Sequence, residues 1–342
     1  MSNQLNFSDF EYSQKRKKQT RREIFLEKMD SLVPYDMFCD IIQPYYYKIG
    51  NGRQPTPLLV MVKMYLISIW YTLSDEATED MLYENQAVRK FVGVDCNSIP
   101  DETTLCKFRH LLERNNLNHS IFKTLTNKLS EIGILLKEGT IVDATIIEAP
   151  RSKKNKDHAR DPQMGSTTKG SQYYFGMKAH IGVDKDSGLV HSLAVTPANV
   201  PDIDKAGDIV HGEEKMVCGD AGYIGIEKRQ EVCEKFQDGT GRKEKQGRSH
   251  GRRRPDAFVK RDNVTFQISR KRKTVVTEEQ KAEEIQKSKI RARVEHVFGI
   301  IKHVFRFRKV QYRTLAKNEN KLLILCTLAN IHRCGQMKMV TI

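Results

Sequence analysis

The first 135 residues have the periodicity of α-helices, with apolar positions recurring at intervals of three and four residues. Asp101 precedes one such segment as a candidate N-cap, and Thr56 followed by Pro57 precedes another. The apolar run 58–73 is shorter than a membrane span and includes a lysine, so it predicts a buried helix. We therefore expect residues 1–135 to form a helical domain.

The pattern changes near residue 138, where β-branched residues replace the helical spacing. Three segments predict the strands of an antiparallel meander. A helix, a strand that runs into a glycine-containing turn, and a second helix ending near residue 235 are expected to follow. The segments are 139–150, 173–184 and 189–199 for the meander, 200–210 for the first helix and 215–225 for the last strand and turn.

Two further helices are predicted near the end of the chain. Thr277 and Gln280 have the spacing of a capping box, and the residues after them place apolar side chains on one helical face. Another apolar helix covers residues 320–335. Strands followed by alternating helices and strands predict an α/β fold with a mixed sheet over residues 136–342.

The composition indicates a polyanionic partner. The 342 residues carry a net charge of +15 and give a pI near 9.4, with 39% hydrophobic residues and a mean hydropathy of −0.57. Such a charge favours binding to nucleic acid or to an anionic membrane. The N-terminus lacks the apolar core of a signal peptide. The seven cysteines show no ligand spacing, which argues against structural zinc and fits a reducing cytoplasm.

Much of the positive charge lies in two segments. Residues 15–22 carry six cations and predict a flexible basic arm. Residues 241–273 hold thirteen Lys or Arg and three acids, which is +10 of the net charge, and glycine, serine and proline in their first half predict a loop. Arg252, Arg253 and Arg254 lie within it as candidate DNA contacts. A basic loop that only aids solubility remains the alternative.

Two aspartates occupy positions that are unusual for an acid. Asp143 lies inside a β-branched strand, where Asp is disfavoured, although Glu148 is an equally good candidate on the same strand. Asp220 follows a strand and stands between glycines, a common geometry of sites at strand ends. A turn or helix-cap role is the alternative for Asp220.

Glu295 is the third acid, in the middle of a basic amphipathic helix. An ordinary i,i+4 pair with Arg291 would explain it. At about 100° per residue, however, Arg291 and Lys302 lie roughly 40° and 20° from Glu295, so the three form a stripe at the edge of the apolar face. Two Asp on strands and a Glu on a later helix suggest a carboxylate site for two divalent cations, Mg²⁺ or Mn²⁺, as phosphodiester chemistry requires.

The order of these elements resembles the ribonuclease-H-like fold of DDE transposases. The stretches "YYFGMKAHIGVDKDSGLVHSLAVTPANV" and "RARVEHVFGIIK" resemble bacterial insertion-sequence transposases, in the group that includes the fifth insertion-sequence family. The family signature is Tyr, two residues, Arg, three residues, Glu, six residues, Lys. Arg291, Glu295 and Lys302 match it, and Ser288 stands at the Tyr position.

The resemblance implies a ribonuclease-H-like DDE catalytic domain after a helical domain that binds DNA ends or dimerises. It implies that the protein binds terminal inverted repeats, cuts the ends with water, and uses the 3′-OH to attack target DNA, as a dimer or higher oligomer in the bacterial cytoplasm at the nucleoid. Asp143 would then bridge two Mg²⁺ or Mn²⁺ ions, with Asp220 on one ion and Glu295 on the other. Arg291 and Lys302 would contact DNA phosphates.

Two other classes of function fit part of the pattern. A catalytically inactive DNA-binding or regulatory protein would explain the charge, but it does not require the three acids together. A host nuclease of the same fold would not need the helical N-terminal domain. Five polar residues near the candidate site are interpreted as structural, in sheet faces, turns or caps: Lys178, His180, His191, Asn199 and Asp202.

Overall fold

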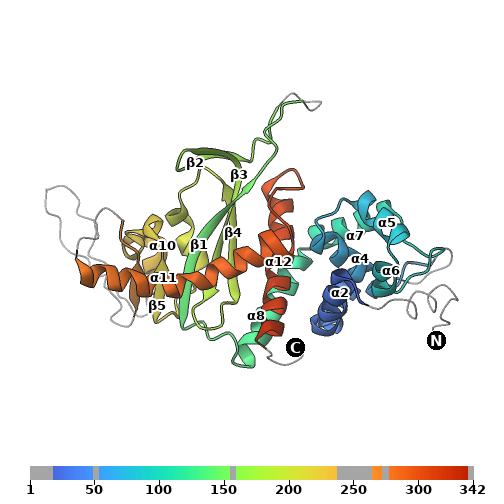
Figure 1. The fold of residues 1–342 in the computed structure, drawn as a ribbon, viewed down its shortest axis with the longest axis horizontal. Helices are drawn as coiled ribbons and strands as arrows, with labels where there is room; N and C mark the ends of the chain where they lie inside the picture. Colours follow the sequence, from blue (N-terminus) through green and yellow to red (C-terminus); the bar gives the residue numbers. More distant parts are fainter. Residues whose placement is uncertain (1–17, 49–53, 155–158, 237–263, 272–276, 338–342) are drawn as a thin grey trace, which may run out of the picture. The chain divides into compact units, whose positions relative to one another are not determined.

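The computed structural model describes residues 18–48, 54–154, 159–236, 264–271 and 277–337. The chain divides into two compact units, one made of residues 1–68, 73–111 and 334–342, and the other of residues 69–72 and 112–333. The fold is mixed α/β, as the sequence predicts, with helices in the N-terminal region and a curled mixed sheet in the C-terminal region (Figure 1). The domain division after residue 135 stays a prediction.

The described part of the first unit is helical. Thr20 begins α2 with the capping box that it forms with Glu23. Asp101 caps α7 as predicted, because its carboxylate accepts a hydrogen bond from the Thr104 amide at 2.6 Å. The helices are α2 (Arg21–Leu32), α3 (Tyr35–Ile42), η1 (Gln43–Tyr45), α4 (Leu58–Trp70), α5 (Asp75–Glu84), α6 (Gln86–Val92) and α7 (Glu102–Arg114), with α4 and α7 ending in the second unit.

Aromatic rings and ion pairs connect these helices. Phe108 of α7 is buried, and its ring makes edge contacts with Tyr46 and Tyr65. Arg109 of α7 donates to Asp75 of α5 at 2.7 Å, so this cation pairs within the unit. Arg21 and Arg22 belong to α2, which corrects the prediction that the whole segment 15–22 is a flexible arm.

The second unit contains a six-stranded sheet. The strands are β1 (Gly139–Glu148), β2 (Gly165–Lys169), β3 (Gln172–Asp184), β4 (Val190–Pro197), β5 (Met216–Gly219) and β6 (Thr265–Ile268). Their order is β2-β3-β1-β5-β6, with β4 also paired to β3. The meander β1-β3-β4 is antiparallel, as predicted, whereas β1, β5 and β6 are parallel to one another. The sequence did not predict β2 or β6.

Short helices cover one face of this sheet. The predicted helix 200–210 is a 3₁₀ turn, η2 (Asp202–Lys205), followed by α9 (Ala206–Ile209). After β5 come η3 (Ala221–Tyr223), η4 (Ile226–Lys228) and α10 (Gln230–Lys235). Together they form one buried cluster with the strands, made of Val142, Ala206, Ile209, Val210, Val217, Tyr223, Ile226, Val232 and Phe236.

The long helix α11 (Glu278–Gly299) runs across the sheet and contacts β1 and β5 (Figure 1). It begins with the predicted capping box of Thr277 and Gln280. A π-helical turn at Ile300–Val304 ends it, and α12 (Leu315–Gln336) follows. The remaining helix of the unit is α8 (Leu117–Glu131), which Asn118 links to α12 through the Asn320 carbonyl.

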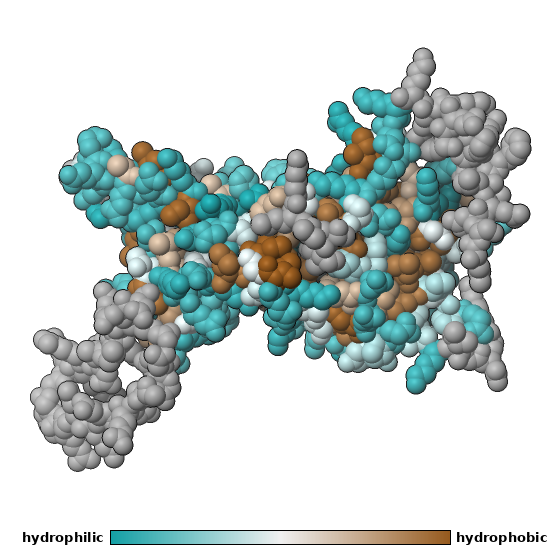
Figure 2. Space-filling model, turned by 90° about the horizontal axis from the view of Figure 1, so that it is seen from below, coloured by the Kyte–Doolittle hydropathy of each residue, from teal (hydrophilic) through white to brown (hydrophobic). Residues whose placement is uncertain are grey.

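The surface is largely charged or polar, as the composition predicts. On the face drawn in Figure 2, hydrophilic residues surround smaller apolar patches. Within the described ranges, no helix alone has the length and apolarity to cross a membrane, although α4 and α5, bent by 105° at their junction, pass that test as a pair.

Candidate active site

The sheet register brings Asp143 and Asp220 to the same place. In the parallel pair β1–β5, Val142 lies opposite Gly219, so the next residue of each strand is one of the two aspartates. The strand β5 ends at this point, and sites in α/β sheets form outside the carboxyl ends of parallel strands. Because side chains alternate along a strand, Asp143 faces away from the buried cluster that contains Val142.

The carboxyl group of Asp143 is largely buried and lies near other charged groups. Its Oδ1 accepts a hydrogen bond from the Ala144 amide at 2.8 Å. The pKa of Asp143 is raised to about 6, mainly by burial and also by the charges of Asp220 and Asp202, while the hydrogen bond from Ala144 and the charge of Arg291 oppose the rise. Asp220, Asp202 and Arg291 therefore lie close enough to Asp143 to influence its charge.

Asp220 is fixed by the turn that follows β5. It is the N-cap of η3, and its Oδ1 accepts from the Gly222 amide at 2.8 Å. A Cβ atom on Gly222 would lie 2.9 Å from that oxygen, closer than ordinary contacts allow. The glycine thus leaves room for the carboxylate, as the sequence suggested. Asp220 is also the N-cap of η3, which the sequence analysis gave as the alternative to a role in the site. The cap role and a role in the site are compatible.

Asp202 is a site residue that the sequence interpretation missed. It was expected to be a cap, but the structure gives η2 no side-chain cap. Its Oδ1 lies 2.9 Å from Nζ of Lys178, which also donates to the Val200 carbonyl at 2.7 Å. The pKa of the buried Tyr223 is raised mainly by burial and then by Asp202, Asp143 and Asp220, which indicates that the Tyr223 hydroxyl lies close to the same acids. Neither Asp202 nor Tyr223 has a sequence signal beyond its place near the strands.

Arg291 joins α11 to the ends of the strands. Ser269 follows β6, and its amide donates to the Gly219 carbonyl at 3.0 Å. Arg291 donates from a terminal guanidinium nitrogen to the Ser269 hydroxyl at 3.3 Å. Since Arg291 also lowers the pKa of Asp143, the arginine of the sequence signature lies beside the two aspartates.

Glu295 lies one helical turn after Arg291 and is exposed to solvent. Over the ranges that the structure describes, no three His, Cys, Asp or Glu side chains are close enough together to hold a metal ion. The structure therefore brings together Asp143, Asp220 and Arg291, but it does not bring Glu295 into a ligand set with the aspartates. Ser288, at the signature Tyr position, is exposed on the same helix.

Lys302 does not continue the helical stripe of Arg291 and Glu295. It lies in the π-helical turn, where the spacing of 100° per residue no longer holds. Its Nζ donates to the Thr145 hydroxyl and, at 3.0 Å, to the Ile146 carbonyl of β1. Burial lowers its pKa. Lys302 thus ties the end of α11 to the strand that carries Asp143.

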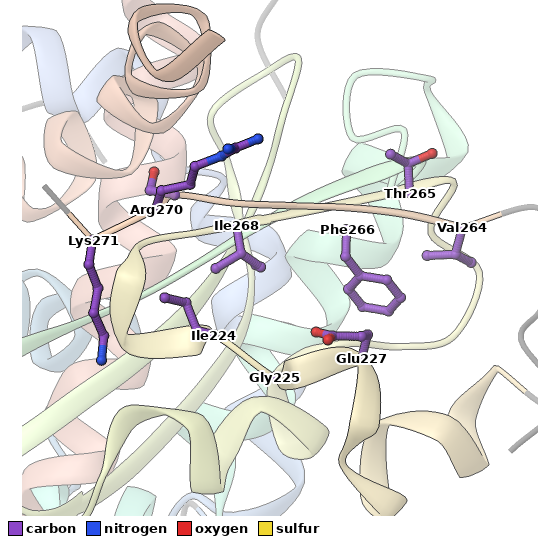
Figure 3. A pocket seen from close by; sticks show the side chains of 10 residues that line it. Ile224, Gly225, Glu227, Val264, Thr265, Phe266, Ile268, Arg270 and Lys271 are labelled. Carbon is purple, nitrogen blue, oxygen red and sulfur yellow. The ribbon is translucent and has the colours of Figure 1, made fainter. Parts of the chain in front are cut away.

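An open cavity of about 770 Å³ adjoins the site along the edge strand β6. Figure 3 shows Ile224, Phe266 and Ile268 on its walls and Arg270 and Lys271 at one end. Arg270 pairs with Glu283 of α11 at 3.2 Å. Because Ser269 also lines this cavity, it is continuous with the ends of the strands that carry the aspartates.

The two strand histidines have structural partners, as expected. Nε2 of His180 lies 2.8 Å from the Thr196 hydroxyl, and burial lowers its pKa to about 4. Nε2 of His191 lies 3.1 Å from the Thr140 hydroxyl, and burial lowers its pKa to about 3. Both are neutral sheet residues at physiological pH. Arg252, Arg253 and Arg254 lie outside the described residues.

The comparisons with known proteins agree with this geometry. The model of the family "Transposase DDE domain" matches residues 135–331, more than half of the chain. The chain belongs to the DDE transposase family. A second family model, "Transposase domain (DUF772)", matches residues 12–111 of the transposase. No solved structure matches the chain. The family is one of DNA-acting enzymes that generally use divalent metal ions.

Proposed function

We propose that the chain binds the terminal inverted repeats of its own insertion sequence, cleaves the DNA at these ends, and joins the 3′-OH ends to target DNA. The observation that supports this most is the position of Asp143 and Asp220, side by side at the ends of parallel strands and next to Arg291. A DDE transposase needs acids there, because its chemistry takes place on a phosphodiester.

In this proposal the carboxylates of Asp143, Asp220 and Glu295 would together hold two divalent cations. Asp143 would be a ligand shared by both ions, with Asp220 a ligand to one and Glu295 a ligand to the other. The two aspartates fit such a role, because their mutual repulsion in a partly buried place is relieved by a cation. Carboxylate oxygens suit Mg²⁺ or Mn²⁺. Such ions, when bound, activate the attacking oxygen and stabilise the leaving oxygen.

Cations of the chain are proposed to hold the DNA. Arg291 is placed to contact a phosphate next to Asp143. The ammonium group of Lys302 has three donors, of which β1 uses two, so one is available for a phosphate. Arg252, Arg253 and Arg254 add contacts from the basic segment. Two DNA ends must meet before joining, so we propose a homodimer or a higher oligomer acting at the bacterial nucleoid.

A two-ended excision assay tests the proposal. A marker gene is placed between the DNA sequences that flank this gene, and excision and integration are measured with purified protein and Mg²⁺. Wild-type protein should give both products, whereas a one-ended substrate should not integrate. Binding without any cleavage would instead support an inactive regulatory protein, and cleavage without joining would support a nuclease.

A further inference from the structure

The β2–β3 hairpin extends beyond the end of β1 in the direction that β1 runs. The strand β1 ends at Glu148, opposite Gly176, whereas β2 pairs with β3 from Gly176 to Gln172. A two-residue turn with Gly170 at φ +63° closes the hairpin. Five residues separate Asp143 from Glu148, or roughly 17 Å at about 3.3 Å per residue. The hairpin therefore begins about 17 Å from the candidate site.

The described part of this region is strongly basic. Residues 149–154 and 159–175 carry five cations and one acid, a net charge of +4. Both oxygens of that acid, Asp161, accept from backbone amides, of Gln163 at 3.0 Å and of Thr314 at 2.9 Å. The carboxylate of Asp161 is thus used by backbone amides. The exposed cations of this region are Lys169 of the hairpin and four residues of the segment before β2, namely Arg151, Lys153, Lys154 and Arg160.

The basic surface continues onto the segment that follows the π-helical turn. An isolated bridge joins Glu148 to Lys309, and Arg306, Arg308 and Lys309 are exposed. After burial, the charges of Lys169 and Arg308 lower the pKa of Lys302, which shows that cations from hairpin, turn and segment lie near one another. Like charges held together in this way favour an anionic partner that neutralises them.

Two arginines of the segment between β1 and β2 pack against aromatic rings of β3. The guanidinium of Arg151 lies 5.5 Å from the ring centre of Tyr173, and it also donates to the Tyr173 carbonyl. Arg160 lies 5.2 Å from the ring centre of Phe175 and donates to the Arg151 carbonyl at 3.1 Å. Tyr173 is 46% exposed. Guanidinium groups held in this way lose less side-chain entropy on contacting a phosphate.

We propose that Arg151, Arg160, Lys169 and Tyr173, the hairpin surface, bind the sugar-phosphate backbone of duplex DNA beside the scissile phosphate. The proposal rests on the function proposed above. The start of the hairpin, about 17 Å from the candidate site, corresponds to roughly five base pairs and Tyr173, three residues farther along β3, to roughly eight, since phosphates of one strand advance about 3.4 Å along the axis per pair. The contacts are made to phosphates and sugars, so they position the DNA and do not read its sequence.

Salt dependence of binding tests the cations. The affinity of full-length protein for a 40-base-pair duplex is measured over a range of salt concentrations. Lys169→Ala should flatten the slope of log K against log salt by about 0.9, and the triple change of Arg151, Arg160 and Lys169 to Ala by up to about 2.7. The matched control is Lys123→Ala with Lys128→Ala, two exposed cations of α8, which should leave the slope unchanged.

Site-specific crosslinking tests where the hairpin surface contacts the DNA. It does not depend on the stability of the alanine variants. A photoreactive benzoylphenylalanine replaces Tyr173, and the crosslinked nucleotides are mapped on a duplex that contains the cleavage site. Tyr173 lies eight residues along β3 from Ile181, the partner of Asp143, or roughly 26 Å, so crosslinks about eight base pairs from that site are expected. The same group at Ile132, which is 57% exposed in the same unit, should give none.

The outcomes separate the two proposals. If wild-type protein binds and cleaves DNA but Lys169→Ala and the triple variant keep its salt slope, the hairpin surface is wrong and the proposed function stands. Crosslinks scattered over the duplex would also overturn it. If wild-type protein binds no DNA at all, the proposed function fails together with this inference.

Discussion

Lys302 donates a hydrogen bond from Nζ to the Ile146 carbonyl oxygen, at 3.0 Å, and so connects the π-helical turn after α11 to β1. A second hydrogen bond reaches the Thr145 hydroxyl. Lys302→Met should therefore destabilise the fold even without DNA, by about 1–3 kcal/mol, because the partly buried acceptors lose their donor. Urea unfolding measures this change. Lys309→Met, at an exposed position, is the control and should have little effect.

The proposed metal ligands should be separable from DNA affinity. Asp143→Asn, Asp220→Asn and Glu295→Gln are each expected to abolish cleavage while binding to element ends stays near wild type, because affinity comes from the cations. Gel-shift and nicking assays on the same preparations check this. Since the structure leaves Glu295 exposed and apart from the aspartates, normal nicking by Glu295→Gln would remove it from the site.

Divalent ions should stabilise the free protein. A ligand that binds only the folded state at ten times its Kd adds about 1.4 kcal/mol. Wild-type protein should thus show a higher Tm in Mg²⁺ than in EDTA, and Ca²⁺ should support DNA binding with little cutting. The shift should vanish in Asp143→Asn and persist in Asp186→Asn, whose side chain is 48% exposed. Cleavage in excess EDTA would contradict metal dependence.

Stability should fall on acidification because of two buried histidines. The folded-state pKa is lowered to about 4 for His180 and about 3 for His191, below the unfolded value near 6.5. The unfolded state therefore takes up protons first, so the contribution of each histidine to stability is complete only well above pH 6.5 and is lost as the pH falls through 6.5 towards the folded-state pKa. From pH 6.5 to pH 5 each histidine should cost about 1.6 kcal/mol.

Urea unfolding at several pH values tests this expectation. His191→Gln should lose less stability between pH 7 and pH 5 than wild type. Equal losses in wild type and His191→Gln would show that His191 does not titrate differently in the two states.

The arginines of the basic segment are expected to bind phosphates. Changing Arg252, Arg253 and Arg254 to Ala should flatten the salt slope by up to roughly 2.7 if all three contact duplex phosphates. Discrimination between element ends and random DNA should change little, since phosphate contacts position the protein. Titrations with both kinds of duplex measure the two quantities. An unchanged slope places the cluster outside the interface, and lost discrimination shows that it reads bases.

Sequence reasoning found the elements that carry strong local signals. The β-branched runs of β1, β3 and β4 and the capping box of α11 are visible in the residues themselves. The strand β2 was missed because Gly-Ser-Thr-Thr-Lys has no apolar alternation, although the Gly-Ser pair after it is a hairpin signal. The four-residue strand β6 was missed because it lies at the end of a basic segment.

The candidate site was predicted only in part, because its geometry depends on contacts between segments that are distant in the sequence. Asp143 and Asp220 each stood out locally, but their proximity depends on the parallel register of β1 and β5, which no local pattern specifies. The pairing of Asp202 with Lys178 is likewise a tertiary contact between distant segments. The π-helical turn changes the direction of Lys302, and angles computed for a regular helix cannot include it.

The distance along the chain between β1 and α11 also limits when the candidate site can first be complete. The candidate residues run from Asp143 to Glu295, about 150 positions, so a nascent chain holds all of them only once synthesis has reached residue 295. At about 5–20 residues per second, synthesis of that stretch takes roughly 8–30 s. During this interval the helical N-terminal segment is already outside the ribosome. A chain interrupted before α11 would thus keep that segment and lack the third acid.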